Sequence, residues 1–276
     1  MTSTTHPSLF SSLVNRYWEI WSEVFGLIGA WTTLLMDVLT WVVRSLIRRR
    51  ARFGAQALAV QVVRVGTRSI GIVLLVSGCI GIILALQTAP SLEQLGQIDK
   101  VANLVGVAVF RELGPLIAAI VLTGFAGASI AAELGTMKVG EEIEALEAMA
   151  LNPIRFLVMP RVIATAGSLL VLTVFADICS VVMGGVVGVL VLDIPYEVYK
   201  SNTLTQLCPT DFTTGLFKAA VFGLMLGLIA CNNGLRVTGG AAGVGRATTN
   251  TVVQTTVAIV IADLLFSALF FSLGLN

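Results

Sequence analysis

Charged residues are scarce in this sequence, and their shortage limits the kinds of protein it can encode. Asp, Glu, Lys and Arg make up 12% of the 276 residues, whereas 56% are hydrophobic and the mean hydropathy is +0.93. A soluble domain ordinarily carries about 25% charged residues. Because so few charges cannot cover a water-facing globule, we predict an integral membrane protein. The formal net charge of +1, without a basic-aromatic surface pattern, gives no sign of a nucleic-acid partner.

Residues for metal binding and catalysis are also few. The four cysteines form no CxxC pair, and the single histidine, His6, has no second ligand nearby. The sequence contains no HExxH, GxSxG or P-loop motif. The first apolar run begins late and lacks a small-residue cleavage site, so we expect no cleavable signal peptide. We also expect no hydrolysis, no bound metal and no bound cofactor in this chain.

Long apolar runs are what the sequence has instead. A membrane-spanning helix needs about 20 predominantly apolar residues. Runs of at least this length occupy roughly 70–90, 101–131, 156–192, 212–235 and 251–274. They predict an all-α membrane domain with five spans over residues 55–276, without an internal repeat or a dividing linker.

The apolar stretch 18–44 has an amphipathic pattern. At about 100° per residue, its polar residues fall in one sector of a helix and its apolar residues face the other way. The polar sector contains Glu19, Ser22, Glu23, Thr33, Asp37, Thr40 and Arg44. A span would place Asp37 in hydrocarbon at a cost of about 3 kcal/mol. Four tryptophans in the stretch suit the headgroup zone. We interpret residues 1–54 as a tail and an interfacial helix, with a sixth span as the alternative.

Lysine and arginine are distributed unevenly between the loops. Basic residues precede the first span and surround the loops after the second and fourth spans, namely Arg44, Arg48, Arg49, Arg50, Arg52, Arg64, Arg68, Lys138, Arg155, Arg161, Arg236 and Arg246. The opposite loops hold only Lys100 and Lys200. Because cytoplasmic loops carry the excess of Lys and Arg, we predict a cytoplasmic N-terminus and an external C-terminus.

The first candidate functional segment is Arg111-Glu-Leu-Gly-Pro115, about ten residues into the second apolar run. Ionisable groups at such a depth are costly and mark functional sites by default. Gly114 and Pro115 predict a local kink. One interpretation is a polar cavity for a headgroup. The other is a purely structural pairing of Arg111 and Glu112, with each other or with Lys218, Asp177 or Asp263.

The second candidate is the segment 133–153 after the second span. Between residues 140 and 153 it predicts a short helix with an apolar stripe of Ile143, Leu146 and Met149 or Ala150. Its acidic residues are Glu141, Glu142, Glu144 and Glu147. Such a helix cannot bury its stripe alone, so it either docks in a groove of a partner or packs on its own membrane domain.

The third candidate is the glycine-rich block 239–249. It lacks the Gly-Lys-Ser/Thr ending of a Walker A motif and does not follow a strand, so it is a weak nucleotide site. We predict a tight turn, with Thr248 or Thr249 capping the last span. The spacings Gly184/Gly188 and Gly223/Gly227 permit close contact between helices.

Three of these blocks together resemble the MlaE/YrbE permease family. They are Arg111-Glu-Leu-Gly-Pro115, then Ala131-Ala-Glu-Leu-Gly-Thr-Met-Lys138 continuing to Glu141-Glu-Ile-Glu-Ala-Leu-Glu147 and Asn152-Pro-Ile-Arg155, and Gly243-Val-Gly-Arg-Ala-Thr-Thr249. Their order and spacing match, and the similarity runs from about residue 55 to the C-terminus. The N-terminal fifty residues match the family only in their general character.

The resemblance implies a permease subunit of an ABC transporter that moves phospholipids between the inner and outer membranes. Members of the family sit as two copies in the inner membrane of diderm bacteria or in related plastid membranes. They have an interfacial N-terminal helix and five spans. Their partners are two cytoplasmic ATPases (MlaF-like), an external MCE-domain protein (MlaD-like) and, as a further candidate, a STAS-domain protein (MlaB-like). ATP would be bound by the partner, not by this chain. Some relatives form heterodimers, so a homodimer is an expectation here.

The resemblance also assigns roles to residues. Arg111, Glu112 and Lys218 match charged positions near the lipid cavity, with Leu84 and Gln87 of the first span also near it. The coupling element that docks on the ATPase corresponds to 133–153, with Glu133, Lys138, Glu141, Glu142, Glu144 and Glu147. The signature residues Gly243, Gly245, Arg246, Thr248 and Thr249 carry no mechanism that the sequence reveals.

Two other functions remain as alternatives. A self-sufficient secondary transporter or channel could use Arg111, Glu112, Asp177, Lys218 and Asp263 as an ion path. Such transporters usually show inverted repeats, and this sequence has no such symmetry. A membrane scaffold without transport is the third hypothesis.

Overall fold

The computed structural model describes residues 9–47 and 55–274, and these residues form helices joined by short connections without any strand. In chain order the elements are α1 (Leu9–Ile47), α2 (Ala55–Val65), η1 (Thr67–Ser69), α3 (Ile70–Gln94), η2 (Ile98–Lys100), α4 (Val101–Ala108), η3 (Val109–Leu113), α5 (Gly114–Leu122), η4 (Thr123–Gly127), α6 (Ala128–Val139), α7 (Glu142–Ala148), η5 (Ile154–Val158), α8 (Met159–Leu190), α9 (Tyr196–Gln206), α10 (Pro209–Leu235) and α11 (Gly240–Ser272). Of these, η3, η4 and η5 are π-helical turns inside longer helices.

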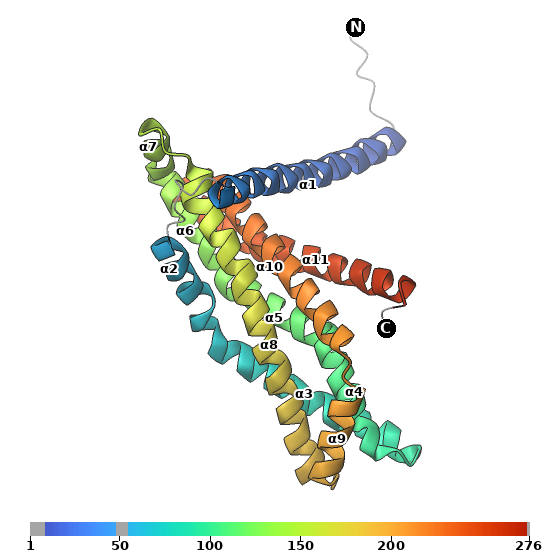
Figure 1. The fold of residues 1–276 in the computed structure, drawn as a ribbon. Coiled ribbons are helices and arrows are strands. Elements are labelled where there is room, and N and C mark those ends of the chain that lie inside the picture. The colour runs from blue at the N-terminus through green and yellow to red at the C-terminus, as the bar shows by residue number, and fades with distance from the viewer. Residues whose placement is uncertain (1–8, 48–54, 275–276) are drawn as a thin grey trace.

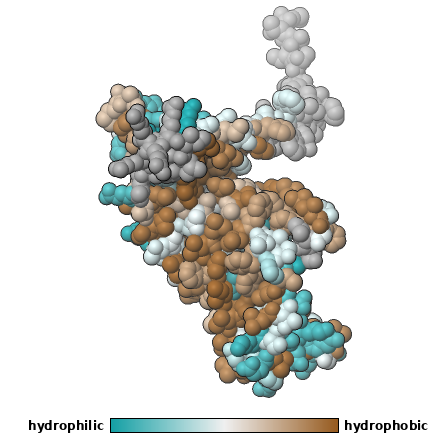
Figure 2. All heavy atoms as spheres, in the orientation of Figure 1, coloured by the Kyte–Doolittle hydropathy of each residue, from teal (hydrophilic) through white to brown (hydrophobic). Residues whose placement is uncertain are grey.

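The long helices form a multi-pass membrane bundle. Six helical segments of the described chain are long and apolar enough to cross a membrane. Figure 2 shows a broad apolar surface between two polar ends, one around α7 and the other around α9. The fold class predicted from the sequence, an N-terminal helix followed by five spanning helices, is therefore confirmed.

Helix α1 lies across the end of the bundle that carries α7, at a steep angle to α6 and α8 (Figure 1). It buries Ala30, Leu34 and Val38, which are spaced four residues apart and so share one face. On the predicted polar face, Thr33, Asp37, Thr40 and Arg44 are exposed. The side chains of Glu19 and Glu23 and the residues Arg48, Arg49, Arg50 and Arg52 lie outside the described parts of the chain. This amphipathic arrangement suits a helix lying along the membrane surface.

Glycines set the closest contacts between the long helices. A Cβ atom on Gly81 of α3 would lie 2.0 Å from the carbonyl oxygen of Ser180 in α8. Gly223 and Gly227 of α10 approach α8 in the same way, with Cβ positions 2.7 Å and 2.9 Å from backbone carbons of Ala166 and Val162. The close packing predicted at Gly223 and Gly227 is thus observed, and Gly81 adds a contact that was not predicted, because only a hydrogen side chain fits between the backbones.

The start of the last span differs from the prediction. Helix α11 begins at Gly240, so most of the glycine-rich block is helical and not a turn. Thr248 and Thr249 do not cap the span, since both hydroxyls donate within the helix to the carbonyl oxygen of Gly245. Glycine is needed at position 243 of this helix, because a Cβ there would lie 1.9 Å from the Thr238 oxygen in the preceding loop.

The short helix of the second candidate segment is observed, although it is shorter than the stretch 140–153. Helix α6 continues to Val139, and α7 covers seven residues. After α7, the side-chain oxygen of Asn152 accepts hydrogen bonds from the backbone nitrogens of Ile154 and Arg155. These bonds start the next long helix and end the connection.

Candidate functional site

A cluster of ionised side chains lies inside the bundle, where α10, α11 and η3 meet. Lys218 of α10 is fully buried, and its ammonium group lies 2.5 Å from Glu112 Oε2 and 2.9 Å from Asp263 Oδ1. Ser267 joins the cluster, with its hydroxyl oxygen 2.9 Å from Lys218 Nζ and 2.8 Å from Glu112 Oε1. All three Lys218 donors therefore have acceptors, as a buried ammonium requires.

The position of the cluster makes these charges costly. Lys218 lies nine residues along α10 from its first residue, or about 14 Å at the helical rise. A charge at such a depth is tolerated only when it faces the bundle or a polar cavity and has a partner. Glu112 has 40% of its side chain exposed, whereas Lys218 has 1%. Lys218 is thus shielded from the outside of the single chain, whereas Glu112, Asp263 and Ser267 are partly exposed.

Arg111 pairs with a different residue of α10. Its guanidinium donates to the carboxylate of Asp211, which is buried in the first turn of α10. The second oxygen of Asp211 accepts a hydrogen bond from the backbone nitrogen of Cys208. Asp211 thus both caps α10 and neutralises Arg111. The sequence did not predict Asp211 as a partner of Arg111.

The π-helical turn η3 explains how adjacent residues reach α10 at two levels. Arg111 and Glu112 both lie in η3, and their partners Asp211 and Lys218 are seven residues apart on α10. Single π-helical turns often occur at functional sites. This π-helical turn ends just before Gly114 and Pro115, which begin α5, and the kink predicted at these two residues stays a prediction.

Asp177 of α8 lies close to this region without joining the ionic cluster. Its Oδ1 atom is buried without a hydrogen-bond partner and lies where a Cβ of Gly114 would be. The remaining two residues proposed for the cavity lie on α3. Leu84 packs in a separate apolar cluster with α4 and α9, and Gln87 is exposed. The structure therefore brings together Arg111, Glu112 and Lys218 but not Leu84 and Gln87.

A second ionic cluster lies at the end of the bundle that carries α7. Glu133 of α6 accepts from Arg64 of α2 at 2.6 Å and from Arg161 of α8 at 3.0 Å. Arg161 is only 4% exposed and also donates to the carbonyl oxygen of Leu157. Glu133 therefore ties three helices together just before α7.

Beyond this cluster, the acidic segment projects from the bundle (Figure 1). Glu141, Glu142, Glu144 and Glu147 are exposed, and Lys138 lies 2.5 Å from Glu144. Of the apolar stripe, Ile143 is buried against the chain, whereas Met149 is 62% exposed. The segment thus presents an acidic surface with an apolar residue at its edge.

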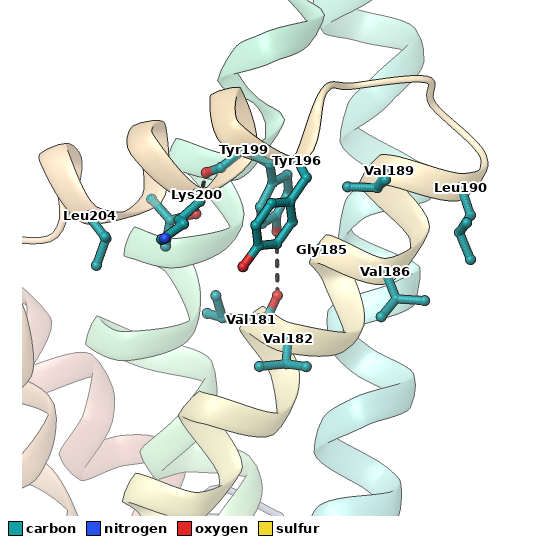
Figure 3. Close-up of a pocket in the computed structure, with 11 residues that line it drawn as sticks. Val181, Val182, Gly185, Val186, Val189, Leu190, Tyr196, Tyr199, Lys200 and Leu204 are labelled. Atoms are coloured by element: carbon teal, nitrogen blue, oxygen red, sulfur yellow. Dashed lines mark hydrogen bonds between the residues drawn. The ribbon is translucent and has the colours of Figure 1, made fainter.

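An apolar groove lies at the opposite end, between α8 and α9 (Figure 3). Its volume is about 590 Å³, and Val182, Val186 and Leu204 are among its lining residues. Lys200 is the charged residue of the lining. Tyr199 holds α9 on α8, because its hydroxyl donates to the Val181 carbonyl oxygen at 3.5 Å. Burial raises the pKa of Tyr199 to about 12, so the hydroxyl stays protonated to a more alkaline pH than an exposed tyrosine would.

Among the described residues no group of His, Cys, Asp or Glu could hold a metal ion. The functional geometry that the sequence reasoning missed consists of Asp211, Ser267 and Arg64, which bind the predicted residues. Each partner is 69 or more residues away along the chain, and a single sequence carries no signal for such pairings.

Comparison with known proteins identifies similar sequences over most of the chain. The family model described as Permease MlaE matches residues 58–269. A probable ABC transporter permease protein of Rickettsia felis is 39% identical over 211 residues, covering 76% of this chain and 82% of that protein. One from Synechocystis is 35% identical, covering 75% and 79%. The protein TRIGALACTOSYLDIACYLGLYCEROL 1 of Arabidopsis thaliana chloroplasts is 35% identical, covering 76% and 60%.

Proposed function

Because this chain belongs to the MlaE permease family, whose similar members are named ABC transporter permeases, we propose that it moves phospholipids between the inner and outer membranes. The name of the Arabidopsis relative refers to a diacylglycerol lipid, which supports a glycerolipid as the cargo. Energy would come from ATP hydrolysed by a separate subunit, and the chain itself would bind no cofactor.

The observation that carries this proposal is the ionic cluster around Lys218. A phospholipid headgroup carries charge that must be matched while it leaves the aqueous surface. Glu112 is the half-exposed member of the cluster and holds Lys218 from the open side. We propose that a headgroup approaching Glu112 exchanges with this ion pair, so that lipid entry is coupled to the contacts between η3, α10 and α11.

The ATPase would dock on the acidic segment of α7. Its four acidic residues are exposed and the segment extends beyond the bundle (Figure 1), while Glu133 links the base of the segment to α2 and α8. Movement of α7 would therefore be transmitted to three spanning helices through packed side chains.

Reversing two charges of the acidic segment 141–147 is expected to weaken ATPase binding at least about tenfold, because like charges would then face the basic surface proposed for the partner. The variant is Glu141→Lys with Glu144→Lys, and the measurement is co-purification of the ATPase together with its ATP hydrolysis rate. The matched control reverses two exposed acids at the other end, Glu93→Lys with Glu197→Lys, and should bind normally. Equal binding by both variants would remove α7 as the docking element.

The remaining assembly is also a proposal. A second copy of the chain would cover the apolar face of α11, where Val257, Ile261 and Leu264 are exposed. An MCE-domain protein would meet the end that carries α9, and a STAS-domain protein could join the ATPase. With basic residues gathered at the α7 end, the N-terminus would be cytoplasmic and the C-terminus periplasmic in a bacterial inner membrane.

A further inference from the structure

A polar pocket lies where α10 ends and α11 begins. Its volume is about 350 Å³, and its polar lining residues are Asn233, Arg236, Thr238, Arg246 and Asn250. The pocket is at the α7 end of the bundle, because the neighbouring residues Val237 and Val244 pack against Gly135 near the end of α6. It includes part of the glycine-rich signature block, to which the proposed transport path gives no role.

The pocket has positive charge without a matching carboxylate. Neither Arg236 nor Arg246 forms an ion pair with another described residue, and no acidic residue is in the lining. By contrast, Arg64, Arg111 and Arg161 each bind a carboxylate inside the bundle. Two converging guanidinium groups with amide and hydroxyl neighbours are the donor set that a phosphate group requires.

The glycines shape this pocket around Arg246. Gly239 and Gly240 have φ values of +86° and +66°, which L side chains rarely adopt, and they turn the chain directly into α11. One terminal nitrogen of Arg246 lies 3.2 Å from the position that a Gly239 Cβ would take. The guanidinium therefore folds back over the start of α11, where the helix dipole adds positive potential. A larger residue at Gly239 would displace it.

The position of α1 indicates which phosphate can reach the pocket. The amphipathic helix α1 crosses the same end of the bundle (Figure 1), and Arg155 lies over its Trp41 ring at 5.6 Å. A Trp-bearing amphipathic helix occupies the headgroup layer of a bilayer. The pocket at this end of the bundle is thus within reach of lipid phosphates of the same leaflet.

We propose that Arg236 and Arg246 form a binding site for the phosphate group of an anionic phospholipid in the leaflet in which α1 lies. Thr238 and Asn250 would provide further hydrogen bonds to the phosphate oxygens, whereas the amide nitrogen of Asn233 already donates to Thr251 and Gln254. The site is separate from the Lys218 cluster. It therefore goes beyond the proposed transport and gives the signature block a lipid-binding role.

Native mass spectrometry of the full chain in detergent, without ATP or ATPase, tests this site. The probes are dioleoylphosphatidylglycerol and dioleoylglycerol, which has the same acyl chains without the phosphate. We expect the first lipid to bind and the combined variant Arg236→Gln with Arg246→Gln to weaken that binding at least about tenfold. The variant Arg246→Lys, which keeps the positive charge, should lose less of this lipid binding. Arg68→Gln, an exposed arginine outside the pocket, should bind as the parent does.

Three results would overturn the site. The first is equal phosphatidylglycerol binding by the parent and the combined variant, with unchanged thermal unfolding showing that both are folded. The second is binding of inorganic phosphate in this pocket while the lipid does not bind. The third is loss of ATPase co-purification in the combined variant with unchanged lipid binding, which would assign the arginines to a protein contact. These experiments measure lipid binding and not transport. A negative result would therefore rule out this phosphate site without ruling out the proposed transport function, which is tested separately.

Discussion

Replacing Lys218 with Met is expected to destabilise the protein by about 3 to 5 kcal/mol, which is the usual effect of removing one partner from a buried ion pair. Met has a similar volume, so it can fill the buried position of the Lys218 side chain. The carboxylates of Glu112 and Asp263, however, would lose the ammonium group that both contact within 2.9 Å. The measurement is thermal unfolding in detergent, with Lys200→Met as the control because Lys200 is exposed.

A second variant separates the structural role of this cluster from its role in transport. Combining Lys218→Met with Glu112→Gln and Asp263→Asn removes all three charges, so stability should recover most of the loss. If the cluster contacts a headgroup, the neutral protein should still fail to move phospholipid. A neutral variant that transports at the parental rate would mean that the charges only hold helices together. A Lys218→Met variant as stable as the parent would contradict the ion pairs described between Lys218, Glu112 and Asp263.

Replacing Gly81 with Ala should be the most damaging of the single-methyl additions in α3. The added Cβ would lie 2.0 Å from the Ser180 carbonyl oxygen, and both atoms belong to backbones that cannot rotate away. The helices would have to separate, which would also break the hydrogen bond from Ser180 Oγ to the Ser77 carbonyl oxygen at 2.7 Å. Overpacking of this kind costs about 1 to 3 kcal/mol, and more where backbone is the obstacle.

The control for this variant is Gly71→Ala in the same helix. Nothing lies within 4 Å of a Cβ at Gly71, and Ala is the better helix former by about 1 kcal/mol. We expect Gly71→Ala to unfold at the parental temperature or above it, and Gly81→Ala to unfold well below it. Equal unfolding temperatures for the two variants would show that α3 and α8 do not approach as closely as described.

The bundle itself could be predicted from the sequence because its signals are local. Apolar runs of spanning length and the amphipathic pattern with exposed Asp37 and Thr40 depend only on nearby residues. The start of the last span could not be predicted in the same way. Glycine disfavours helix, so the composition of the block favoured a turn, and only the folded backbone shows that Gly243 sits in the helix where its Cβ would clash with the Thr238 oxygen.

The candidate site could be predicted in part. Arg111, Glu112 and Lys218 could be identified as candidates because they are ionisable residues within apolar runs. Removing such a group from water is costly, so it usually marks a functional site. Lys218 and Asp263 were named among several possible partners, but the choice between them could not be made, and Asp211 was missed because it meets Arg111 only when the long helices pack. The π-helical turn that directs Arg111 and Glu112 to separate levels of α10 has no sequence signature. The two arginines that pair with Glu133 could likewise be identified only from the fold.

The central claim is that this chain moves phospholipid with energy taken from a separate ATPase. Its most direct test reconstitutes the chain with that ATPase in liposomes and measures the transfer of labelled phospholipid with ATP, with ADP, and with an ion gradient alone. We predict transfer that requires both the ATPase and ATP hydrolysis, and its loss in the Glu141→Lys with Glu144→Lys variant. Transfer driven by an ion gradient without any ATPase would contradict the account and identify a self-sufficient secondary transporter.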